Sequence, residues 1–342
     1  MMTEEIKKPT KNPIKRFLDP RTQIVRRAKW YAIAPLSIIF IGLLVVLIFN
    51  FNLGLDFTGG RIVTVSNFAE SESQQVQRIV QEEMQRESIY RTHLQIEERT
   101  GGGGTVISVR FPEPAVFDGL NHTEVNEILD RITAAINVRL TADGLVGPIE
   151  ISGAETISPS ASQERILNTF VAIALALIGI LIYMLFRFKI NSGVAAIVGL
   201  FHDVLVMAAL VAIFQIQVNF VFVAAMITII AYSLNNTLVL FDRVRTKEKD
   251  LENRMTTTQL VDASIKETFV RQLATTVTTI VPVAILAIFG VPLIREFAIP
   301  ILFGLVAGFF STIFVTSALY VRFEDARKRK LKAKLSTNTS SK

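Results

Sequence analysis

The chain has 342 residues, of which 50% are hydrophobic, and carries a formal net charge of +6. Its mean hydropathy of +0.43 is higher than that of ordinary soluble domains. It contains no cysteine, which excludes disulfides, thiol catalysis and zinc–thiolate sites.

The chain begins with a basic segment, residues 1–30, that holds nine Lys or Arg against three acidic residues. Short basic segments next to a membrane span stay on the cytoplasmic side. The apolar run that follows, residues 31–49, is too long for the core of a typical cleavable signal peptide and has no small-residue cleavage site. We therefore expect a retained first span with a cytoplasmic N-terminus.

Residues 50–163 differ sharply from the rest of the chain. They contain sixteen acids, eight arginines and no lysine, for a net charge of 8 − 16 = −8. This segment is long enough for a small folded domain, and its acidity predicts an extracytoplasmic position. The +6 charge of the whole chain is therefore a signal of membrane topology, and we expect no nucleic-acid partner.

Alternation and helical spacing within this loop predict the order β-α-β-β-α-β, which is typical of a ferredoxin-like α+β domain. The Gly101–Gly104 run is predicted to be a hairpin loop. A ferredoxin-like fold by itself predicts no function. The expected strands lie at Arg61–Phe68, around Leu94 and Ile96, at 107–111 and at Gly147–Ser152, and the expected helices at 76–84 and 125–136, with caps at Ser71 and Asn121.

Five further apolar stretches fill residues 164–321, and a basic tail, residues 322–342, ends the chain. A helix needs about 20 apolar residues to cross a bilayer. Buried helices of a large soluble protein are a poor alternative, because too little polar chain is present to cover them. The predicted spans are Ile166–Phe186, Ile190–Phe214, Asn219–Phe241, Gln272–Ile294 and Phe297–Val321.

The basic residues between these spans fall on the side of the two termini, which agrees with an even number of spans. The fold class predicted is a membrane bundle of six transmembrane helices with one extracytoplasmic α+β domain between helices 1 and 2. The localisation predicted is the cytoplasmic membrane, multi-pass, with both termini cytoplasmic.

His202 and Asp203 lie near the middle of the third span, and Asp203 is the only formally charged residue in any of the six spans. Ionisable residues inside a membrane are costly and mark proton relays or paired helix contacts. Two interpretations stay open: the pair relays protons, or it is a hydrogen-bonded pair that fastens one helix to its neighbours.

The fourth and fifth spans carry further polar residues. Tyr232, Ser233 and Asn236 share one helical face, and an asparagine amide can bridge helices but cannot carry a proton at neutral pH. Arg271 opens the fifth span, where it either serves a site or reaches the lipid headgroups. The other polar candidates of these two spans are Asn235, Thr237, Gln272, Thr275, Thr276, Thr278 and Thr279, and Asp242 directly follows the fourth span.

Small residues and prolines shape the last two spans. Gly304 and Gly308 form a small-xxx-small pattern that lets helices approach closely. Pro282 and Pro292 are expected to kink or end the fifth span, because proline removes a backbone hydrogen bond.

Several motifs together resemble the SecF branch of the SecD/SecF family, which belongs to the RND superfamily. The segment Gly54-Leu55-Asp56-Phe57-Thr58-Gly59-Gly60 is similar to the family signature GLDFTGG, and residues 200–204 to LLHDV. Residues 231–245 resemble GYSxNDT followed by FDRxR. Residues 264–271 and 304–314 resemble the remaining signatures, so that only the termini lie outside the likeness.

The resemblance implies a subunit that pairs with SecD and assists the SecYEG channel in protein export, driven by the proton-motive force. It also implies association with the translocating preprotein and with YajC and YidC. No nucleophile–base set, metal-ligand spacing or nucleotide loop is present, so we expect no enzymatic activity, cofactor or metal.

One residue departs from the family pattern in an informative way. The family has aspartate where this chain has Asn236, and glycine where it has Ala231. That aspartate, with the arginine matching Arg271, is the family's proposed proton-path pair. Two hypotheses follow: SecD supplies the titrating carboxylate, or Asp203 carries the proton. Two other functions stay open, a structural SecDF subunit without proton coupling and half of an RND-type exporter of small molecules or lipids.

Overall fold

We analysed a computed structural model of the chain. It describes residues 17, 19, 22–58, 60–68, 72–86, 95–101, 104–111, 122–142, 150–157, 159–250 and 255–340. The chain divides into two compact units, which are described separately. One consists of residues 52–172 and 217–220, and the other of residues 1–51, 173–216 and 221–342.

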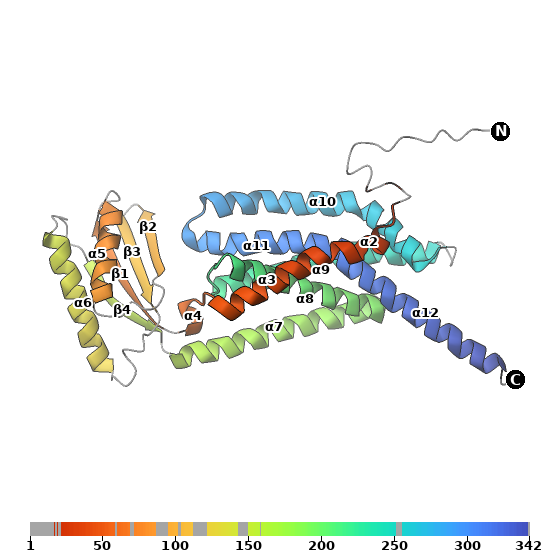
Figure 1. Cartoon of the computed structure of the whole chain (residues 1–342), viewed down its shortest axis with the longest axis horizontal. Helices are drawn as coiled ribbons and strands as arrows, with labels where there is room; N and C mark the ends of the chain where they lie inside the picture. The colour runs from red at the N-terminus through yellow and green to blue at the C-terminus, as the bar shows by residue number, and fades with distance from the viewer. Residues whose placement is uncertain are drawn as a thin grey trace. The chain divides into compact units, whose positions relative to one another are not determined.

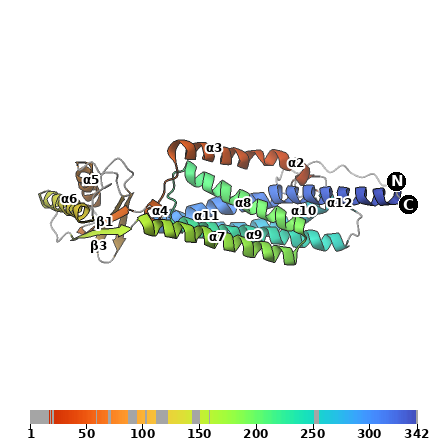
Figure 2. The same ribbon diagram turned by 90° about the horizontal axis from the view of Figure 1, so that it is seen from below.

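The first unit contains a four-stranded antiparallel sheet with the strand order β2-β3-β1-β4. Helices α5 and α6 contact each other and lie on one face of the sheet (Figures 1 and 2). In chain order the elements are β1 (Gly60–Phe68), α5 (Ser73–Arg86), β2 (Gln95–Gly101), β3 (Gly104–Phe111), α6 (His122–Ala142) and β4 (Glu150–Ile157).

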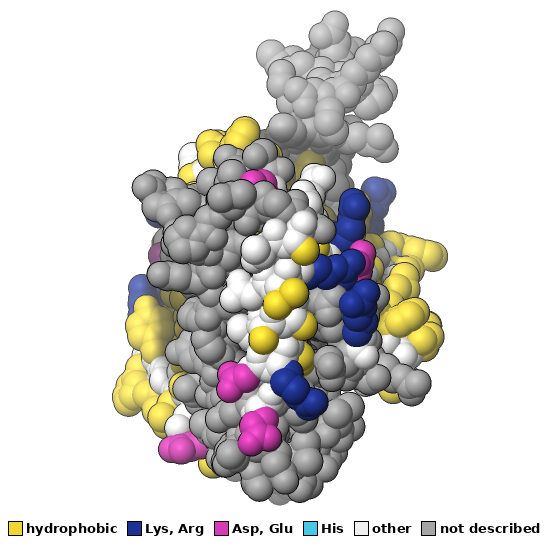
Figure 3. All heavy atoms as spheres, turned by 90° about the vertical axis from the view of Figure 1, so that its left-hand side faces the viewer, with side chains coloured by type: hydrophobic (Ala, Val, Ile, Leu, Met, Phe, Trp, Pro, Cys, Tyr) yellow, Lys and Arg dark blue, Asp and Glu magenta, His cyan; other side chains and the backbone are white. Residues whose placement is uncertain are grey.

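The described core of this unit comes from apolar residues at helical spacing. Val76, Ile79 and Val80 of α5 are buried, and so are Ile132 and Ile136 of α6, because these spacings place them on one helix face. The described surface carries both acidic and basic side chains (Figure 3).

The last strand and the two helix caps can be compared with the predictions only in part. The last strand was predicted at Gly147–Ser152; β4 is Glu150–Ile157 and continues five residues beyond the predicted end, whereas residues 147–149 lie outside the described residues. The predicted caps Ser71 and Asn121 lie outside the described residues.

The second unit is a helical bundle, and the described part of the chain contains six helical segments long and apolar enough to cross a membrane. The prediction of six spans is therefore confirmed in number. The helices are α2 (Ile24–Tyr31), α3 (Ile33–Phe49), α7 (Pro159–Arg187), α8 (Ile190–Ile213), α9 (Phe220–Asp250), α10 (Thr257–Phe289), α11 (Pro292–Ser311) and α12 (Ser317–Ser340). A π-helical turn, η4 (Thr312–Thr316), joins α11 to α12.

Several helices extend beyond the predicted spans. Helix α10 begins fifteen residues before the predicted fifth span, where Thr256 and Gln259 form a capping box. Pro282 lies inside α10, which continues to Phe289. Pro292 does not end that helix but is the first residue of α11, a position where the missing amide costs nothing.

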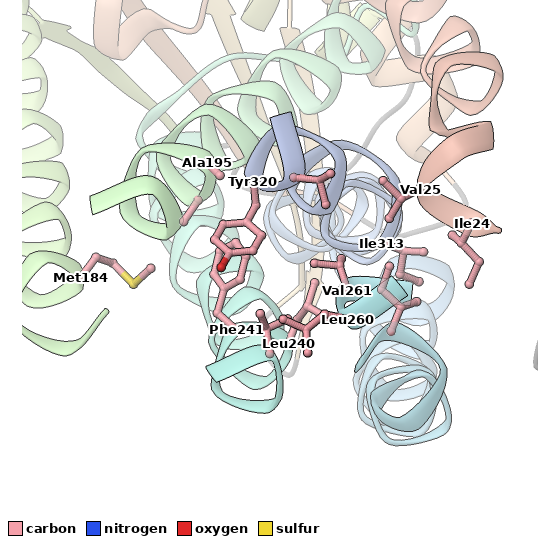
Figure 4. Packing of buried hydrophobic residues seen from close by; sticks show 14 residues of the cluster. Ile24, Val25, Met184, Ala195, Leu240, Phe241, Leu260, Val261, Ile313 and Tyr320 are labelled. Atoms are coloured by element: carbon pink, nitrogen blue, oxygen red, sulfur yellow. The ribbon is translucent and has the colours of Figure 1, made fainter. Parts of the chain in front are cut away.

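Buried apolar residues join α2, α7, α8, α9, α10 and α12 at one end of the bundle (Figure 4). The rings of Phe241 and Tyr320 pack with their centroids 5.2 Å apart. The short helix α2 is fastened here by Asp262, whose Oδ1 accepts a 2.9 Å hydrogen bond from the amide of Val25. This buried carboxylate satisfies one of the amides that a helix start leaves without an intrahelical partner.

Small residues allow the other helices to approach closely. A Cβ at Gly42 of α3 would lie 2.4 Å from Cβ of Ala209 in α8, and one at Gly304 of α11 would lie 2.5 Å from a side-chain atom of Ile229 in α9. A Cβ at Gly308 would touch Ser233 at 3.0 Å. The glycines of α11 therefore bring this helix against the polar face of α9.

Candidate functional site

Asp203 of α8 is the centre of a polar network inside the helical unit. Its side chain is 1% exposed. The Oδ2 atom accepts hydrogen bonds from the hydroxyls of Ser233 in α9, at 2.5 Å, and Ser311 in α11, at 2.8 Å. One carboxylate thus connects three helices. A carboxyl oxygen has two lone pairs, so Oδ2 can accept both hydrogen bonds at once.

His202 contacts the other oxygen of this carboxylate. Its Nδ1 lies 3.0 Å from Oδ1 of Asp203. The Nε2 atom is buried and has no hydrogen-bond partner among the described residues. The structure therefore joins the two residues that the sequence singled out, and adds two hydroxyls to them.

Protonation of Asp203 would change the hydrogen bonds that hold these helices. A protonated carboxyl becomes a donor and loses acceptor capacity. Ser311 has another acceptor within reach, because its hydroxyl lies 3.2 Å from the carbonyl oxygen of Gly308. A hydroxyl has one proton, so Ser311 can bond either to Asp203 or to its own helix. The arrangement is able to link a proton to the contact between α8 and α11.

The π-helical turn η4 begins immediately after Ser311. Thr312 donates to the carbonyl of Gly308 at 2.9 Å, and its oxygen lies 3.3 Å from the hydroxyl of Thr237 in α9. The hydroxyl of Thr316, at the end of the turn, is buried without a partner among the described residues. Single π turns inside α-helices are frequent at functional sites, because they loosen the regular hydrogen-bond ladder.

Asn236 lies on the α10 side of α9 rather than beside Asp203. It is 2% exposed, and its backbone carbonyl accepts a 3.4 Å hydrogen bond from Nε2 of Gln272. The Nδ2 atom of Asn236 and the hydroxyl of Thr276 are both buried without a partner in the described chain. This position therefore has an unsatisfied donor and nothing that titrates.

The remaining candidates lie outside this network. Arg271, Thr275, Thr278 and Asn235 are exposed on the described surface of α9 and α10. Tyr232 joins the two helices through a 3.2 Å hydrogen bond to Thr279. Asp242 is also exposed, and it forms an ion pair with Arg187 at 2.9 Å.

The glycine-rich signature segment packs against the start of α9. The amide of Gly54 donates to the carbonyl of Val218, and the amide of Val218 donates to that of Asn52, both at 2.8 Å. Asp56, in the short helix α4 (Leu55–Thr58), accepts a 3.1 Å hydrogen bond from the amide of Phe220, the first residue of α9. Asp56 therefore caps the helix that carries Ser233.

Close packing explains two further residues of this segment. A Cβ at Gly54 would lie 2.7 Å from the side chain of Gln217. The ring of Phe57 contacts that of Phe220, with centroids 5.2 Å apart. Gly60 begins β1, and Gly59 lies outside the described residues.

Ser311 and Thr312 were not among the predicted site residues. They continue the small-residue face of α11, because Gly304, Gly308, Ser311 and Thr312 follow the spacing of one helix face. The interpretation of Gly304 and Gly308 as packing residues alone missed the two hydroxyls that lie further along the same helix face.

We predict that replacing Asp56 with alanine destabilises the chain by about 1 kcal/mol, the typical effect of losing a helix cap. The amide of Phe220 loses its acceptor and should exchange faster with deuterium. Asp56→Asn keeps an acceptor and should behave like the parent. Thermal unfolding in detergent and hydrogen exchange of the 217–222 peptide measure both effects. Equal behaviour of the two variants would contradict the capping role.

Comparison with known proteins identifies the family of the chain. Residues 140–326 match the family described as protein export membrane protein SecD/SecF, C-terminal, and residues 46–66 match the SecD/SecF GG motif. The protein translocase subunit SecF of Helicobacter pylori is 32% identical over 82% of this chain and 80% of its own length. The SecF of Ketogulonicigenium vulgare is 33% identical over 88% of this chain and 89% of its own.

Solved structures are also similar to this chain. The crystal structure of SecDF from Thermus thermophilus, described as a translocon-associated membrane protein, matches with a TM-score of 0.69 and 27% identity. The match covers 90% of this chain and 39% of that protein. The six apolar helices, the glycine-rich segment and these extended similarities show that this chain is a membrane protein of the SecD/SecF family.

Proposed function

We propose that the chain is a SecF-type subunit that pairs with SecD and assists SecYEG-dependent protein export across the cytoplasmic membrane. The observation that carries the proposal is similarity to SecF proteins over four fifths or more of both chains. The match to a translocon-associated protein more than twice as long supports a need for a partner, because this chain corresponds to 39% of that protein. An exporter of small molecules lacks such support.

The unit containing the sheet is proposed to be a ferredoxin-like domain on the extracytoplasmic side. The element order β1-α5-β2-β3-α6-β4 and the sheet order β2-β3-β1-β4 support the fold. The net charge of −8 for residues 50–163, without a single lysine, supports the orientation, since positive charge favours the cytoplasmic side. Both termini are then cytoplasmic.

The cysteine-free sequence allows a direct test of this topology. Asp130 is exposed on α6, and Lys334 is exposed on α12. In intact spheroplasts, Asp130→Cys should react with a membrane-impermeant maleimide, whereas Lys334→Cys should react only after the membrane is permeabilised. The reverse pattern would contradict the orientation.

Proton coupling is proposed to act through Asp203. The support is the shared carboxylate, which contacts α9 and α11 through Ser233 and Ser311. A proton bound at Oδ2 of Asp203 leaves this atom one lone pair, so only one of the two hydroxyls keeps its bond to it, and Ser311 then bonds to Gly308. Asn236 cannot replace Asp203 in this role, because an amide does not titrate near neutral pH.

Replacing Asp203 with asparagine tests this coupling, because it keeps the size of the side chain and removes the titration. In membrane vesicles, we expect export in the presence of a proton gradient to fall to the level that ATP alone supports. Asp242→Asn is the matched control, since Asp242 is exposed and paired with Arg187. Full gradient-dependent export by Asp203→Asn would instead favour a structural subunit without its own proton coupling.

The exposed polar face of α9 and α10 is proposed to contact SecD. It consists of Asn235 on α9 and Arg271, Thr275 and Thr278 on α10. Exposed polar side chains within a span are costly in lipid and usually face a protein partner or water. Arg271 has no acidic partner in the described chain, and it stays charged at all relevant pH values. An acidic residue of the partner would neutralise it.

This contact predicts that Arg271→Gln weakens co-purification with SecD in mild detergent, because a charge pair in the interface is lost. Arg322→Gln is the matched control, because it removes the same charge from the exposed surface of α12. We expect the control to retain SecD as the parent does. If both variants retain SecD equally, the α9–α10 face is not the docking surface. Contacts with YajC, YidC and the translocating preprotein are further proposals that the same purification would examine.

A further inference from the structure

A cavity of about 310 Å³ lies beside the turn that joins α7 to α8. It is bounded by residues of this turn, by the second half of α9 and by α12. Both apolar rings and charged side chains line it. The residues that matter to its chemistry are Phe186, Arg187, Lys189, Ser192, Arg245 and Tyr320.

Two buried hydroxyl-bearing residues line this cavity without a hydrogen-bond partner in the described chain. Ser192 is 6% exposed and Tyr320 is 2% exposed. Each hydroxyl oxygen keeps some accessible surface at the cavity, because neither is among the fully enclosed side-chain atoms that lack a partner in the described chain. Figure 4 shows Tyr320 beside Phe241, which also lines the cavity. Buried hydroxyls normally have partners, so this pair indicates an occupant that accepts hydrogen bonds.

The cavity wall holds one positive charge without an acidic partner in the described chain. Arg187, Lys189 and Arg245 line it together with Glu248, but Arg187 pairs with Asp242 at 2.9 Å. Lys189 bonds to Glu248 at 2.7 Å, whereas Arg245 donates only to the backbone carbonyl of Arg187, at 3.0 Å. Arg245 therefore has a charge that no described acid neutralises. Helix α8 also begins here, without a side-chain cap, and a helix start favours anions.

The edge of the cavity is apolar and borders a membrane span. Phe186, the residue before Arg187, is 90% exposed, and the most apolar stretch of α7 has no buried residue. A ligand that fits has an anionic group with several acceptor oxygens and also a hydrocarbon part. A phosphate alone would leave this apolar edge without a contact.

We propose that this cavity binds the phosphate of an anionic phospholipid, with the acyl chains along α7. The hydroxyls of Ser192 and Tyr320 donate to the phosphate oxygens, and Arg245 neutralises its charge. Basic sites between helices at one end of the spans are suited to such headgroups. The site is separate from the network around Asp203 and does not depend on proton coupling.

The single tryptophan of the chain makes a direct measurement possible. In a Trp30→Phe, Phe186→Trp background, the full chain is placed in phosphatidylcholine vesicles that contain either phosphatidylglycerol or phosphatidylcholine with brominated acyl chains. Quenching of the new tryptophan then reports the preference for the anionic lipid. We expect a preference of about tenfold, which is in the range of charge-assisted hydrogen bonds.

Four further substitutions in this background test the named contacts. Arg245→Gln should abolish the preference, and Ser192→Ala and Tyr320→Phe should each lower it roughly threefold, because each removes one hydrogen bond. Lys249→Gln removes a charge from the same helix outside the cavity, and it should leave the preference unchanged. Because Tyr320→Phe and Ser192→Ala remove only an oxygen, their effect does not require a loss of folding.

Three outcomes would overturn the proposal. The parent could show no preference for phosphatidylglycerol. Lys249→Gln could lower the preference as much as Arg245→Gln while the hydroxyl variants change nothing, which would indicate diffuse surface charge. Finally, excess inorganic phosphate could abolish the preference, which would assign the site to free phosphate instead of a lipid.

Discussion

The carboxylate of Asp203 is the interaction on which the helical unit depends. Within the six predicted spans it is the only formal charge, and it is buried. Hydroxyls from α9 and α11 and the imidazole of His202 satisfy it. A buried carboxylate that lost these donors would be strongly destabilising, because lipid and the surrounding apolar side chains offer none. The same contacts tie three helices to one side chain.

Helix α9 connects this network to the glycine-rich segment. At its first residue the helix is capped by Asp56, and about four turns later it presents Ser233 to Asp203. The signature segment thus has a physical role that its sequence alone does not reveal. It anchors the start of the helix that carries the buried hydroxyl, and β1 begins only two residues after α4 ends.

The polar groups of the helical unit fall into three environments with different chemistry. The network around Asp203 is enclosed and nearly fully paired. The face with Asn235 and Arg271 is exposed, which suits a protein partner. The cavity beside Ser192 and Tyr320 has two hydroxyls and one arginine, Arg245, without a side-chain partner in the described chain, which suits an anion. Each environment follows from the cost of leaving a polar group without a partner in an apolar medium.

The sequence by itself determined the number of spans and identified His202 and Asp203 as the polar pair inside the third span. Both follow from local chemistry, because a hydrophobic run long enough to cross a bilayer must be helical to satisfy its own backbone. The helical spacing of Val76, Ile79 and Val80 likewise predicted a buried face of α5. The pattern was weaker at element ends, where β4 ends later than predicted and Pro292 begins a helix.

Only the tertiary structure decided which polar residues meet. Asn236 and Asp203 both lie in spans, yet Ser233 faces Asp203 while Asn236 faces Gln272. Ser311 joins the site because close contacts at Gly304 and Gly308 set α11 against α9, and the π turn follows it. These outcomes depend on the rotation of each helix about its axis and on its distance from its neighbours. A helical repeat in one segment specifies a face, but packing between segments chooses what that face contacts.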